Sequence, residues 1–366
     1  MLYPLRFRPV YKDYLWGGRA LASFGKILPS TGIVAESWEI SAHHNGISVI
    51  ANGSLAGASL PDVVRTFGRS LLGNAAADRD LAKFPLLIKL IDARERLSVQ
   101  VHPDDLYALR HENGEYGKNE MWYVVAAQPG ARLVAGLKPG ICRADFTEAI
   151  ARGHCLDCLQ TISVQAGDAV NIPAGLVHAI GGGLVICEIQ QNSDTTYRVY
   201  DYDRRDSEGK TRPLHIDKAL DVIDFSRPPQ TPLISGLIIR QGGLTRRILV
   251  LNRYFMVEEQ QIKNSADFLS DGRRFSTLTV LQGQGSLSFT HDSSIAITEP
   301  LFPGDSLLIP ASLGSWQIRG DLTMIVSRPA DYAADLANLA GLAHMAETAE
   351  LAGSGLIALD PKPEPA

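Results

Sequence analysis

Two histidines, one glutamate and one glutamine are the residues of this sequence best suited to hold a metal ion: Gln100, His102, Glu120 and His178. Two imidazoles, a carboxylate and an amide oxygen form a mixed nitrogen and oxygen set, which suits a catalytic divalent metal such as zinc, iron or manganese. No cysteine belongs to the set, which argues against a structural zinc site. A lone His102 would be better explained as an ordinary core or surface histidine, so the interpretation depends on all four residues.

His178 closes a stretch that predicts a strand, a tight turn and a second strand. A Gly-Asp pair at 167–168 signals a turn, residues 169–172 are typical of a short strand, and Pro173 and Gly175 require another turn. A histidine that opens the next strand can point into a small β-barrel, where such barrels hold ligands. On this stretch alone, a surface hairpin with an incidental histidine explains the pattern equally well.

Other polar positions lie on predicted strands. Residues 97–102 alternate with a period of two, which places Gln100 and His102 on one face of a strand. That face either lines a metal site or polar pocket, or is simply solvated. Lys89 interrupts the apolar strand 86–93, and a buried lysine is unfavourable unless it is paired or faces a wet pocket.

Residues 192–204 are dense in polar and aromatic side chains and include Asp194 and Arg198. This composition is typical neither of a core strand nor of a disordered segment. Segments of such mixed character usually line a binding site, and we expect the same of this one.

An internal repeat indicates the fold class. Residues 304–310 repeat the pattern of residues 167–173 at an offset of 304 − 167 = 137 positions, and Ser315 stands at the offset position of His178. Two copies fit a pair of related β-barrels, one active and one structural, better than a propeller or solenoid, which needs three or more copies. We therefore predict a mainly β fold of two jelly-roll-like barrels with small helical insertions, in which the second barrel lacks metal ligands.

The predicted domains follow this repeat. We expect a catalytic barrel domain over residues 1–235, with helical insertions at about 60–84 and 104–160. A second barrel domain is expected over residues 236–330. The Ala- and Leu-rich end, 331–366, predicts a helical tail with a frayed terminus.

Composition excludes several classes of partner. The chain has 45% hydrophobic and 20% charged residues, which is typical of a soluble globular protein. A formal net charge of -5 argues against nucleic acid or an acidic membrane held by bulk charge. No segment reaches the roughly 20 apolar residues of a membrane helix. A lone C-x-x-C at 155–158 and the absence of a signal peptide favour reduced thiols in the cytoplasm.

Several motifs together resemble the cupins, and more narrowly the type I mannose-6-phosphate isomerases of the shorter bacterial branch. The similarity extends over nearly the whole chain, to about residue 330. The motifs are Trp-Gly-Gly at 16–18, Glu-Ser-Trp-Glu-Ile-Ser at 36–41, Leu-Ser-Val-Gln-Val-His-Pro-Asp-Asp at 97–105, Gly-Lys-Asn-Glu-Met-Trp-Tyr at 117–123, Pro-Ala-Gly-Leu-Val-His-Ala-Ile-Gly-Gly-Gly at 173–183 and the run at 188–204. The cupin signature alone says little about function, because that fold hosts many chemistries.

The resemblance implies a double cupin with one zinc site beside a pocket for a small phosphorylated sugar. It assigns zinc to Gln100, His102, Glu120 and His178, proton transfer to Lys118 and Asp194, an essential arginine to Arg198, and the substrate cleft to Trp16, Glu36 and Lys89. One departure is Gly117, where longer family members carry a histidine. A ring-opening role for that histidine cannot be carried over to this chain.

The resemblance also implies an activity, the interconversion of mannose 6-phosphate and fructose 6-phosphate through an enediolate, by a cytoplasmic monomer or homodimer. This chemistry needs an electrophile on the C1 and C2 oxygens and a base near the carbon acid. Asp194 or Lys118 could be that base. The alternatives are a non-catalytic sugar-binding or sensing cupin, another phosphosugar isomerase and a metal-dependent cupin oxygenase.

Overall fold

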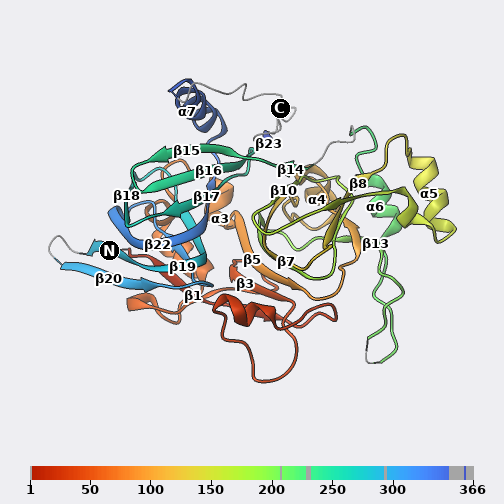
Figure 1. Ribbon diagram of the computed structural model, residues 1–366, viewed down its shortest axis with the longest axis horizontal. Helices are drawn as coiled ribbons and strands as arrows, with labels where there is room; N and C mark the ends of the chain where they lie inside the picture. The colour runs from red at the N-terminus through yellow and green to blue at the C-terminus, as the bar shows by residue number, and fades with distance from the viewer. Residues whose placement is uncertain (1, 207, 228–231, 292–294, 346–357, 360–366) are drawn as a thin grey trace.

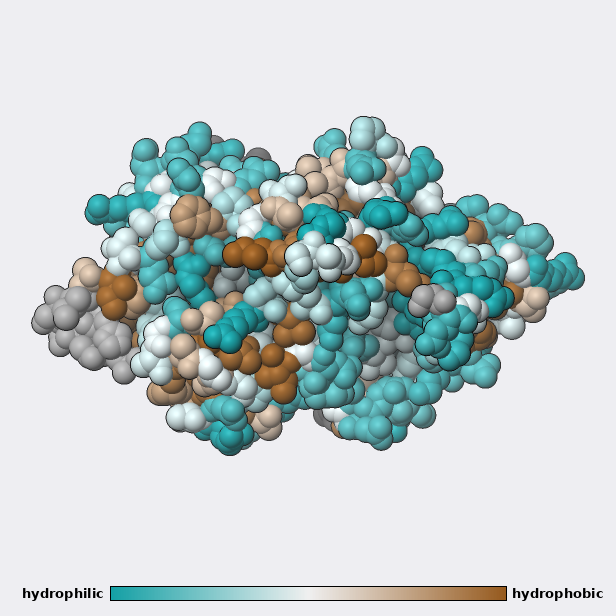
Figure 2. All heavy atoms as spheres, turned by 90° about the horizontal axis from the view of Figure 1, so that it is seen from below, coloured by the Kyte–Doolittle hydropathy of each residue, from teal (hydrophilic) through white to brown (hydrophobic). Residues whose placement is uncertain are grey.

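The computed structural model describes residues 2–206, 208–227, 232–291, 295–345 and 358–359. Two β-barrels lie side by side along the long axis of the molecule (Figure 1). Figure 2 shows them as two lobes that meet at a narrower waist. The predicted pair of barrels is therefore confirmed. Within the described residues, no helix is long and apolar enough to cross a membrane.

The first barrel is built from two sheets. In order, the seven-stranded sheet contains β14 (Leu233–Ile234), β10 (Ala169–Ile172), β7 (Glu120–Ala127), β12 (Leu184–Gln191), β5 (Leu86–Ala93), β3 (Glu36–Ile40) and β2 (Val10–Lys12). In order, the five-stranded sheet contains β13 (Tyr197–Tyr200), β6 (Val99–Val101), β11 (His178–Ile180), β8 (Arg132–Leu137) and β9 (Leu159–Ser163).

The second barrel is an eleven-stranded sheet that includes strands from the start of the chain. Its path runs through β15 (Leu237–Gln241), β16 (Leu244–Leu251), β17 (Phe255–Ile262), β22 (Gly314–Pro329), β19 (Ser276–His291), β21 (Ser306–Ile309), β1 (Leu5–Arg8) and β4 (Val49–Ile50), with β18 (Ser265–Ser270), β20 (Ile295–Leu301) and β23 (Ala358–Leu359) paired to its sides. Because β1 pairs with β21, the first strand of the chain joins the sheet of the last barrel. A domain boundary at residue 235 therefore does not separate the two barrels completely, because β1 precedes that boundary and belongs to the second barrel.

Three of the hydrophobic cores lie between these layers. One lies between the two sheets of the first barrel and includes Trp122, Val124 and Ile186. A second joins the outer face of the seven-stranded sheet to the second barrel. The third lies between the outer face of the five-stranded sheet and helices α5 (Arg143–Ala151) and α6 (Ile216–Val222), visible at the right of Figure 1. The seven-stranded sheet is therefore buried on both faces.

The helices are short and cover the barrels. They are α1 (Leu60–Phe67), α2 (Arg69–Leu72), α3 (Asp78–Ala82), α4 (Asp105–His111), α5 (Arg143–Ala151), α6 (Ile216–Val222) and α7 (Tyr332–Met345), with short 3-10 turns η1 (Ala20–Phe24), η2 (Gly53–Leu55) and η3 (Cys155–Cys158). The expected insertion at 60–84 contains α1 to α3. The range 104–160 contains α4 and α5 but also β7 and β8, which belong to the barrel sheets. Helix α7 begins the expected tail, whose frayed end at 360–366 lies outside the described residues.

The internal repeat has a structural counterpart. Strand β10 occupies 169–172 and β21 occupies 306–309, so their bounds differ by the same 137 positions as the sequence motif. Gly167 and Gly304 each precede their strand with positive φ angles of 91° and 86°, a backbone conformation that favours glycine. The turn therefore belongs to the barrel architecture, while the histidine is specific to the first copy.

The expectation that residues 192–204 form no core strand is wrong in part, because residues 197–200 form β13. Tyr197 and Val199 are buried against the helices, while Arg198 between them faces the other way. The alternation is that of a half-buried strand. The inward-facing residue is the charged Arg198 rather than an apolar side chain, so the hydrophobic alternation typical of a strand is absent from the sequence here.

Glu258 on β17 is fully buried and pairs with two arginines of the second barrel. Its Oε2 lies 2.7 Å from Arg246 Nε and its Oε1 lies 2.9 Å from Arg328 Nη2. Burial would raise the pKa of Glu258, but the two arginines outweigh burial and lower it from 4.5 to about 2. A lowered pKa contributes stability above the unfolded value, and that stability is lost as the pH falls toward 2.

We expect Glu258→Gln to lower the free energy of unfolding by about 3 kcal/mol at pH 7, at about 1.4 kcal/mol per pKa unit. Denaturant titrations of both proteins at pH 7 and at low pH measure this difference, which should shrink between about pH 4.5 and pH 2. Glu299→Gln is the control, because Glu299 pairs with Arg6 on the partly exposed surface and such pairs contribute about 0–1 kcal/mol. A difference for Glu258→Gln that stays constant with pH would contradict the ion-pair explanation.

Candidate metal site

The seven-stranded sheet directs a row of ionisable side chains into the first barrel. Along β7, Tyr123 packs toward the second barrel and Trp122 packs into the first, so Glu120 also faces inward. Cross-strand pairing places Lys89 of β5 opposite Glu188 of β12, and Glu188 opposite Trp122. The interior of this barrel is therefore polar along part of its length.

The five-stranded sheet supplies the facing residues. Val99 and Val101 pack outward against the helices, which turns Gln100 inward, as the period-two alternation predicted. Gln100 lies opposite His178 on one side and opposite Arg198 on the other. Residues from both sheets of the barrel thus share one interior space.

Three of the four expected ligands lie within metal-binding distance of one another. The ligand atoms of His102, Glu120 and His178 are all within 4.8 Å of each other, and all three residues are buried. Nε2 of His102 is 3.4 Å from Glu120 Oε1, and Nε2 of His178 is 3.8 Å from Glu120 Oε2. The Gln100 amide nitrogen lies 3.3 Å from His178 Nε2, at the side of this set.

Backbone carbonyls determine which nitrogen of each histidine is free. His102 Nδ1 lies 2.8 Å from the carbonyl oxygen of Thr195, and His178 Nδ1 lies 2.9 Å from that of Leu176. A carbonyl only accepts hydrogen bonds, so each Nδ1 carries the proton and donates. The lone pairs of both Nε2 atoms therefore face Glu120, which is the arrangement that orients metal-binding imidazoles.

Charge and burial favour the protonation states that a metal needs. Burial and the neighbouring His102 lower the pKa of His178 to about 3. Burial and the Lys118 ammonium lower the pKa of His102. Burial would raise the pKa of Glu120, but Lys118 and His102 outweigh it and hold that pKa well below its usual range. Two neutral imidazoles and one carboxylate are thus present at neutral pH.

One ligand atom lacks a partner. Among the described residues, none hydrogen-bonds to Glu120 Oε2, although this oxygen is buried. A buried carboxylate oxygen without a donor is unfavourable unless a cation or water satisfies it. The donor set and this unsatisfied oxygen fit a divalent metal.

Lys118 lies inside the same set. Its Nζ donates to Glu120 Oε1 and lies 3.0 Å from His102 Nε2, and the side chain is buried. This position excludes an ordinary surface lysine. Lys118 is within reach of whatever binds to the ligand atoms.

Lys89 forms a separate buried network on the seven-stranded sheet. Its Nζ lies 3.0 Å from Glu188 Oε1 and 3.8 Å from Glu36 Oε2. Burial would lower the pKa of Lys89, but Glu188 and Glu36 outweigh it and raise the pKa above its usual value. Trp122 Nε1 donates to Glu188 at 2.9 Å and Trp38 Nε1 donates to Glu36 at 2.6 Å. The buried Lys89 ammonium is therefore paired mainly with the Glu188 carboxylate.

Sequence reasoning did not single out Glu188 as a functional residue. The signal that could have found it is Lys89 itself, because a lysine within a buried strand needs a buried carboxylate nearby. Burial and the nearby Glu120 raise the pKa of Glu188. The pKa of Glu188 is therefore shifted upward, whereas that of Glu120 in the same barrel is shifted downward.

Asp194 and Trp16 occupy different surroundings. Asp194 is half-buried and accepts a 2.9 Å hydrogen bond from Asn45 Nδ2. Burial, then the charge of Glu36 and then that of Asp194 raise the pKa of Tyr14 to about 12. Trp16 is 3% exposed and belongs to the barrel core, although its ring centre lies 5.7 Å from that of Tyr14. Trp16 therefore packs in the barrel core with its ring beside that of Tyr14.

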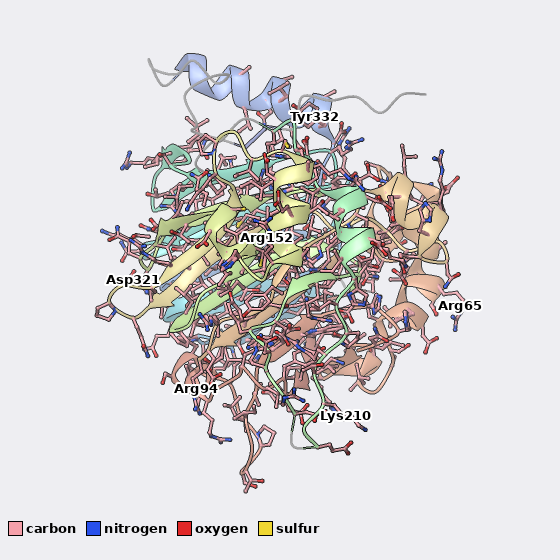
Figure 3. The ribbon with its side chains drawn as sticks, turned by 90° about the vertical axis from the view of Figure 1, so that its right-hand side faces the viewer. Arg65, Arg94, Arg152, Lys210, Asp321 and Tyr332 are labelled. Carbon is pink, nitrogen blue, oxygen red and sulfur yellow. The ribbon has the colours of Figure 1, made fainter. Side chains whose placement is uncertain are left out.

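A cluster of arginines surrounds the buried Asp201. Arg212 donates through Nε at 2.8 Å and Nη2 at 2.6 Å, and Arg204 also pairs with this carboxylate. Burial and nearby Arg212 lower the pKa of Arg198, so Arg198 faces the same cluster. Arg204 and Arg212 on one carboxylate, with Arg198 nearby, leave a local excess of positive charge. Lys210, shortly before Arg212, lies away from the barrel (Figure 3).

Gly117 is required by the close approach of two segments. A Cβ atom at this position would lie 2.5 Å from the backbone carbon of Asp104 and the backbone nitrogen of Asp105. The Gly117 amide donates to Asp105 Oδ1 at 2.8 Å. A histidine at position 117 does not fit in this chain without moving the backbone.

A second group of possible ligands is better explained as structural. His43, His44 and Glu115 also lie close together. However, Lys83 Nζ is 2.6 Å from Glu115 Oε2, and the backbone amide of Asn45 donates to His43 Nδ1. The carboxylate is already neutralised, and His43 uses its lone pair on a hydrogen bond. We therefore do not assign a metal site to His43, His44 and Glu115.

Comparison with known proteins gives the same picture over most of the chain. Residues 4–123 match the family of phosphomannose isomerase type I catalytic domains, and residues 245–329 match the cupin domain of mannose-6-phosphate isomerases. The chain is 40% identical over 324 residues to the mannose-6-phosphate isomerase ManA of Bacillus subtilis, covering 88% of this chain and 98% of the relative. It is also 40% identical over 329 residues to the mannose-6-phosphate isomerase of Streptococcus mutans, covering 89% and 98%.

Solved structures agree with the fold. The crystal structure of the mannose 6-phosphate isomerase from Bacillus subtilis is similar with a TM-score of 0.81 at 36% identity, covering 89% of this chain and 99% of that one. A putative mannosephosphate isomerase from Archaeoglobus fulgidus has a TM-score of 0.69 at 22% identity, covering 89% and 98%, and supports the fold alone.

Proposed function

This chain belongs to the type I phosphomannose isomerase family, and we propose that it interconverts mannose 6-phosphate and fructose 6-phosphate. The observation that carries the proposal is the buried set of His102, Glu120 and His178 with the Lys118 ammonium inside it. That set combines a site for an electrophile with a proton-transfer group. An aldose-ketose isomerase needs both.

The family is metal-dependent, and we propose zinc as the metal of this chain. His102, Glu120 and His178 would hold it, with Gln100 as the fourth ligand, because neutral imidazoles and a carboxylate are ligands that zinc prefers. When bound, the metal supplies Lewis-acid polarisation of the C1 and C2 oxygens. The residues around it have the remaining tasks of orienting the sugar and moving the proton.

Lys118 and Asp194 are the proposed proton-transfer residues. Of the two, Lys118 is better placed for the C1–C2 proton, because its Nζ lies beside two ligand residues, next to which the substrate oxygens would bind. Asp194 is held by Asn45 in a more exposed position, which suits exchange of protons with solvent. Microscopic reversibility requires the same pair to serve both directions.

The remaining expected site residues line the proposed sugar pocket. Glu36 and Lys89 present a buried carboxylate and ammonium from the seven-stranded sheet, which suits hydroxyl groups of the sugar. This side carries two carboxylates, Glu36 and Glu188, for one lysine, so it disfavours a phosphate. Arg198 comes from β13 of the five-stranded sheet, and Arg204 and Arg212 pair with Asp201 directly after that strand. We propose that the phosphoryl group binds there.

Arg212→Gln tests this orientation. Among the described residues, Nη1 of Arg212 has no hydrogen-bond partner, whereas Nε and Nη2 are engaged with Asp201. Losing one charge-assisted hydrogen bond to phosphate should raise KM for mannose 6-phosphate roughly 10- to 100-fold with a smaller change in kcat. Steady-state kinetics measure the split. Arg205→Gln is the control, because Arg205 is exposed on the same loop and its guanidinium donates to the Gly209 carbonyl rather than to Asp201. An unchanged KM in Arg212→Gln would place the phosphate elsewhere.

A metal-depletion assay tests the proposed activity. The purified protein should convert mannose 6-phosphate to fructose 6-phosphate, lose that activity after dialysis against a chelator, and regain it when Zn²⁺ is added back. Parallel assays with Mn²⁺ and Fe²⁺ identify the preferred metal. Conversion that continues unchanged after the metal has been removed would refute the proposed chemistry, and absence of conversion in the zinc-loaded protein would refute the proposed activity.

A further inference from the structure

A hydrogen-bond network outside the metal-ligand set joins the three segments that carry the ligands. We propose that Asn119 and Gln191 are positioning residues, which hold the segment with Lys118 and Glu120 in register with the strands of the two histidines. The expected effect on turnover rests on the proposed function. The expected effect on metal affinity depends only on the ligand set of His102, Glu120 and His178.

Asn119 connects the Glu120 segment to the turn that precedes His178. Its Oδ1 accepts a 3.0 Å hydrogen bond from the backbone amide of Ala174. Its Nδ2 donates at 2.8 Å to Gln191 Oε1. The residue between Lys118 and Glu120 therefore bonds in two directions, and neither bond belongs to the ladder of a sheet.

Gln191 connects the same segment to the residues that follow His102. Its Oε1 also accepts from the backbone amide of Asn119 at 3.1 Å, and its Nε2 donates at 2.9 Å to Asp105 Oδ1. The carboxylate can only accept, so Asp105 determines which end of the Gln191 amide faces Asn119. Gln191 is 3% exposed, and a buried amide without these partners would be strongly unfavourable.

Main-chain bonds complete a closed loop of contacts. The Lys118 amide donates at 3.0 Å to the carbonyl of Pro103, and the Gly175 amide donates at 2.9 Å to the carbonyl of His102. The end of β6, the start of β7 and the turn before β11 are thus tied to one another pairwise. The Asn119 and Gln191 side chains provide links that a substitution can remove without changing the main chain.

The consequence is geometric. Glu120 opens β7, and a strand end frays unless something outside the ladder holds it. A shift of this end would move both Glu120 and Lys118 relative to the two imidazoles. Groups that orient ligands in this way typically contribute about 10- to 100-fold in metal affinity or activity when they are lost.

The first test compares two asparagines. Asn119→Ala should weaken Zn²⁺ binding about 10- to 100-fold, measured by competition with a chromophoric chelator and without substrate. Asn252→Ala is the matched control in the second barrel. Asn252 is 7% exposed and its Oδ1 accepts two backbone hydrogen bonds, each of 2.8 Å. Both variants should lower the melting temperature, but only Asn119→Ala should change zinc affinity.

The second test is a double-mutant cycle. Gln191→Met keeps the length of the side chain and removes its hydrogen bonds, so it should weaken Zn²⁺ binding to a similar extent. Because both substitutions break the hydrogen bond between the two side chains, Asn119→Ala combined with Gln191→Met should lose less affinity than the product of the two single losses. With zinc at saturation, kcat should also fall in the single variants, since Lys118 lies on the same segment.

The outcomes separate the proposals. Zinc affinity of Asn119→Ala within about threefold of the wild type, or losses that multiply in the double variant, would overturn the positioning role. An equal loss of affinity in Asn252→Ala would also overturn it, because the effect would then be general destabilisation. If the wild type binds zinc but does not isomerise mannose 6-phosphate, the proposed function fails while the affinity comparison still decides this inference.

Discussion

Replacing His178 with alanine is expected to remove both metal binding and turnover. His178 is fully buried, and its Nε2 faces Glu120 while its Nδ1 donates to a backbone carbonyl. The variant loses one imidazole ligand, and among the described residues no further histidine, cysteine, aspartate or glutamate belongs to this set to replace it. Loss of Lewis-acid polarisation should lower kcat/KM by about 10³-fold or more. Metal analysis of the purified variant and the isomerase assay measure the two effects.

His44→Ala is the matched control for this result. His44 is 72% exposed and lies in the second histidine and glutamate group, which the hydrogen bonds assign to structure. Its replacement should leave both bound metal and turnover close to the wild type. A His178→Ala protein that retains stoichiometric zinc would show that the metal binds elsewhere. One that retains turnover without metal would contradict metal-assisted isomerisation.

The second large effect is expected for Lys118→Ala, which should lower kcat roughly 10²- to 10⁴-fold while the metal is retained. Lys118 contributes a proton-transfer group but no ligand atom. Its removal also takes a positive charge away from Glu120, which favours a bound cation. Solvent deuterium incorporation into the product measures the proton-transfer step directly, and metal analysis establishes that the site is still loaded.

Lys83→Ala is the control for Lys118→Ala, because Lys83 also pairs with a glutamate but lies outside the ligand set. Its kcat should stay near that of the wild type. If Lys118→Ala keeps full activity, Asp194 becomes the base of choice. If the wild type binds zinc and mannose 6-phosphate without converting it, the chain is a sugar-binding cupin, the alternative that the sequence also allowed.

Much of the first barrel could be read from local patterns. Period-two alternation predicted that Gln100 and His102 share a face, and the valines that flank Gln100 do pack outward. The repeat predicted two related barrels, and the bounds of β10 and β21 keep its offset. Such features depend only on residues near one another in the chain, because strand geometry fixes the direction of successive side chains.

The period-two pattern did not predict a strand where the inward-facing residues are polar. In β13, Arg198 stands between two buried residues, and its charge interrupts the hydrophobic pattern that identifies a strand. A hydrophobic pattern identifies a strand whose inner face meets an apolar core. Here the inner face meets a polar site, so the functional residues themselves obscured the secondary structure that positions them.

The sequence by itself determined the ligand types, the strands that carry them and the family to which they belong. Only the tertiary structure decided which partners meet: Lys89 with Glu188, Asp194 with Asn45, and Gln191 with Asn119. It also decided that β1 joins the barrel at the other end of the chain. The physical reason is that side-chain direction is a local property of a strand. Strand order and register, by contrast, depend on burying whole faces against one another.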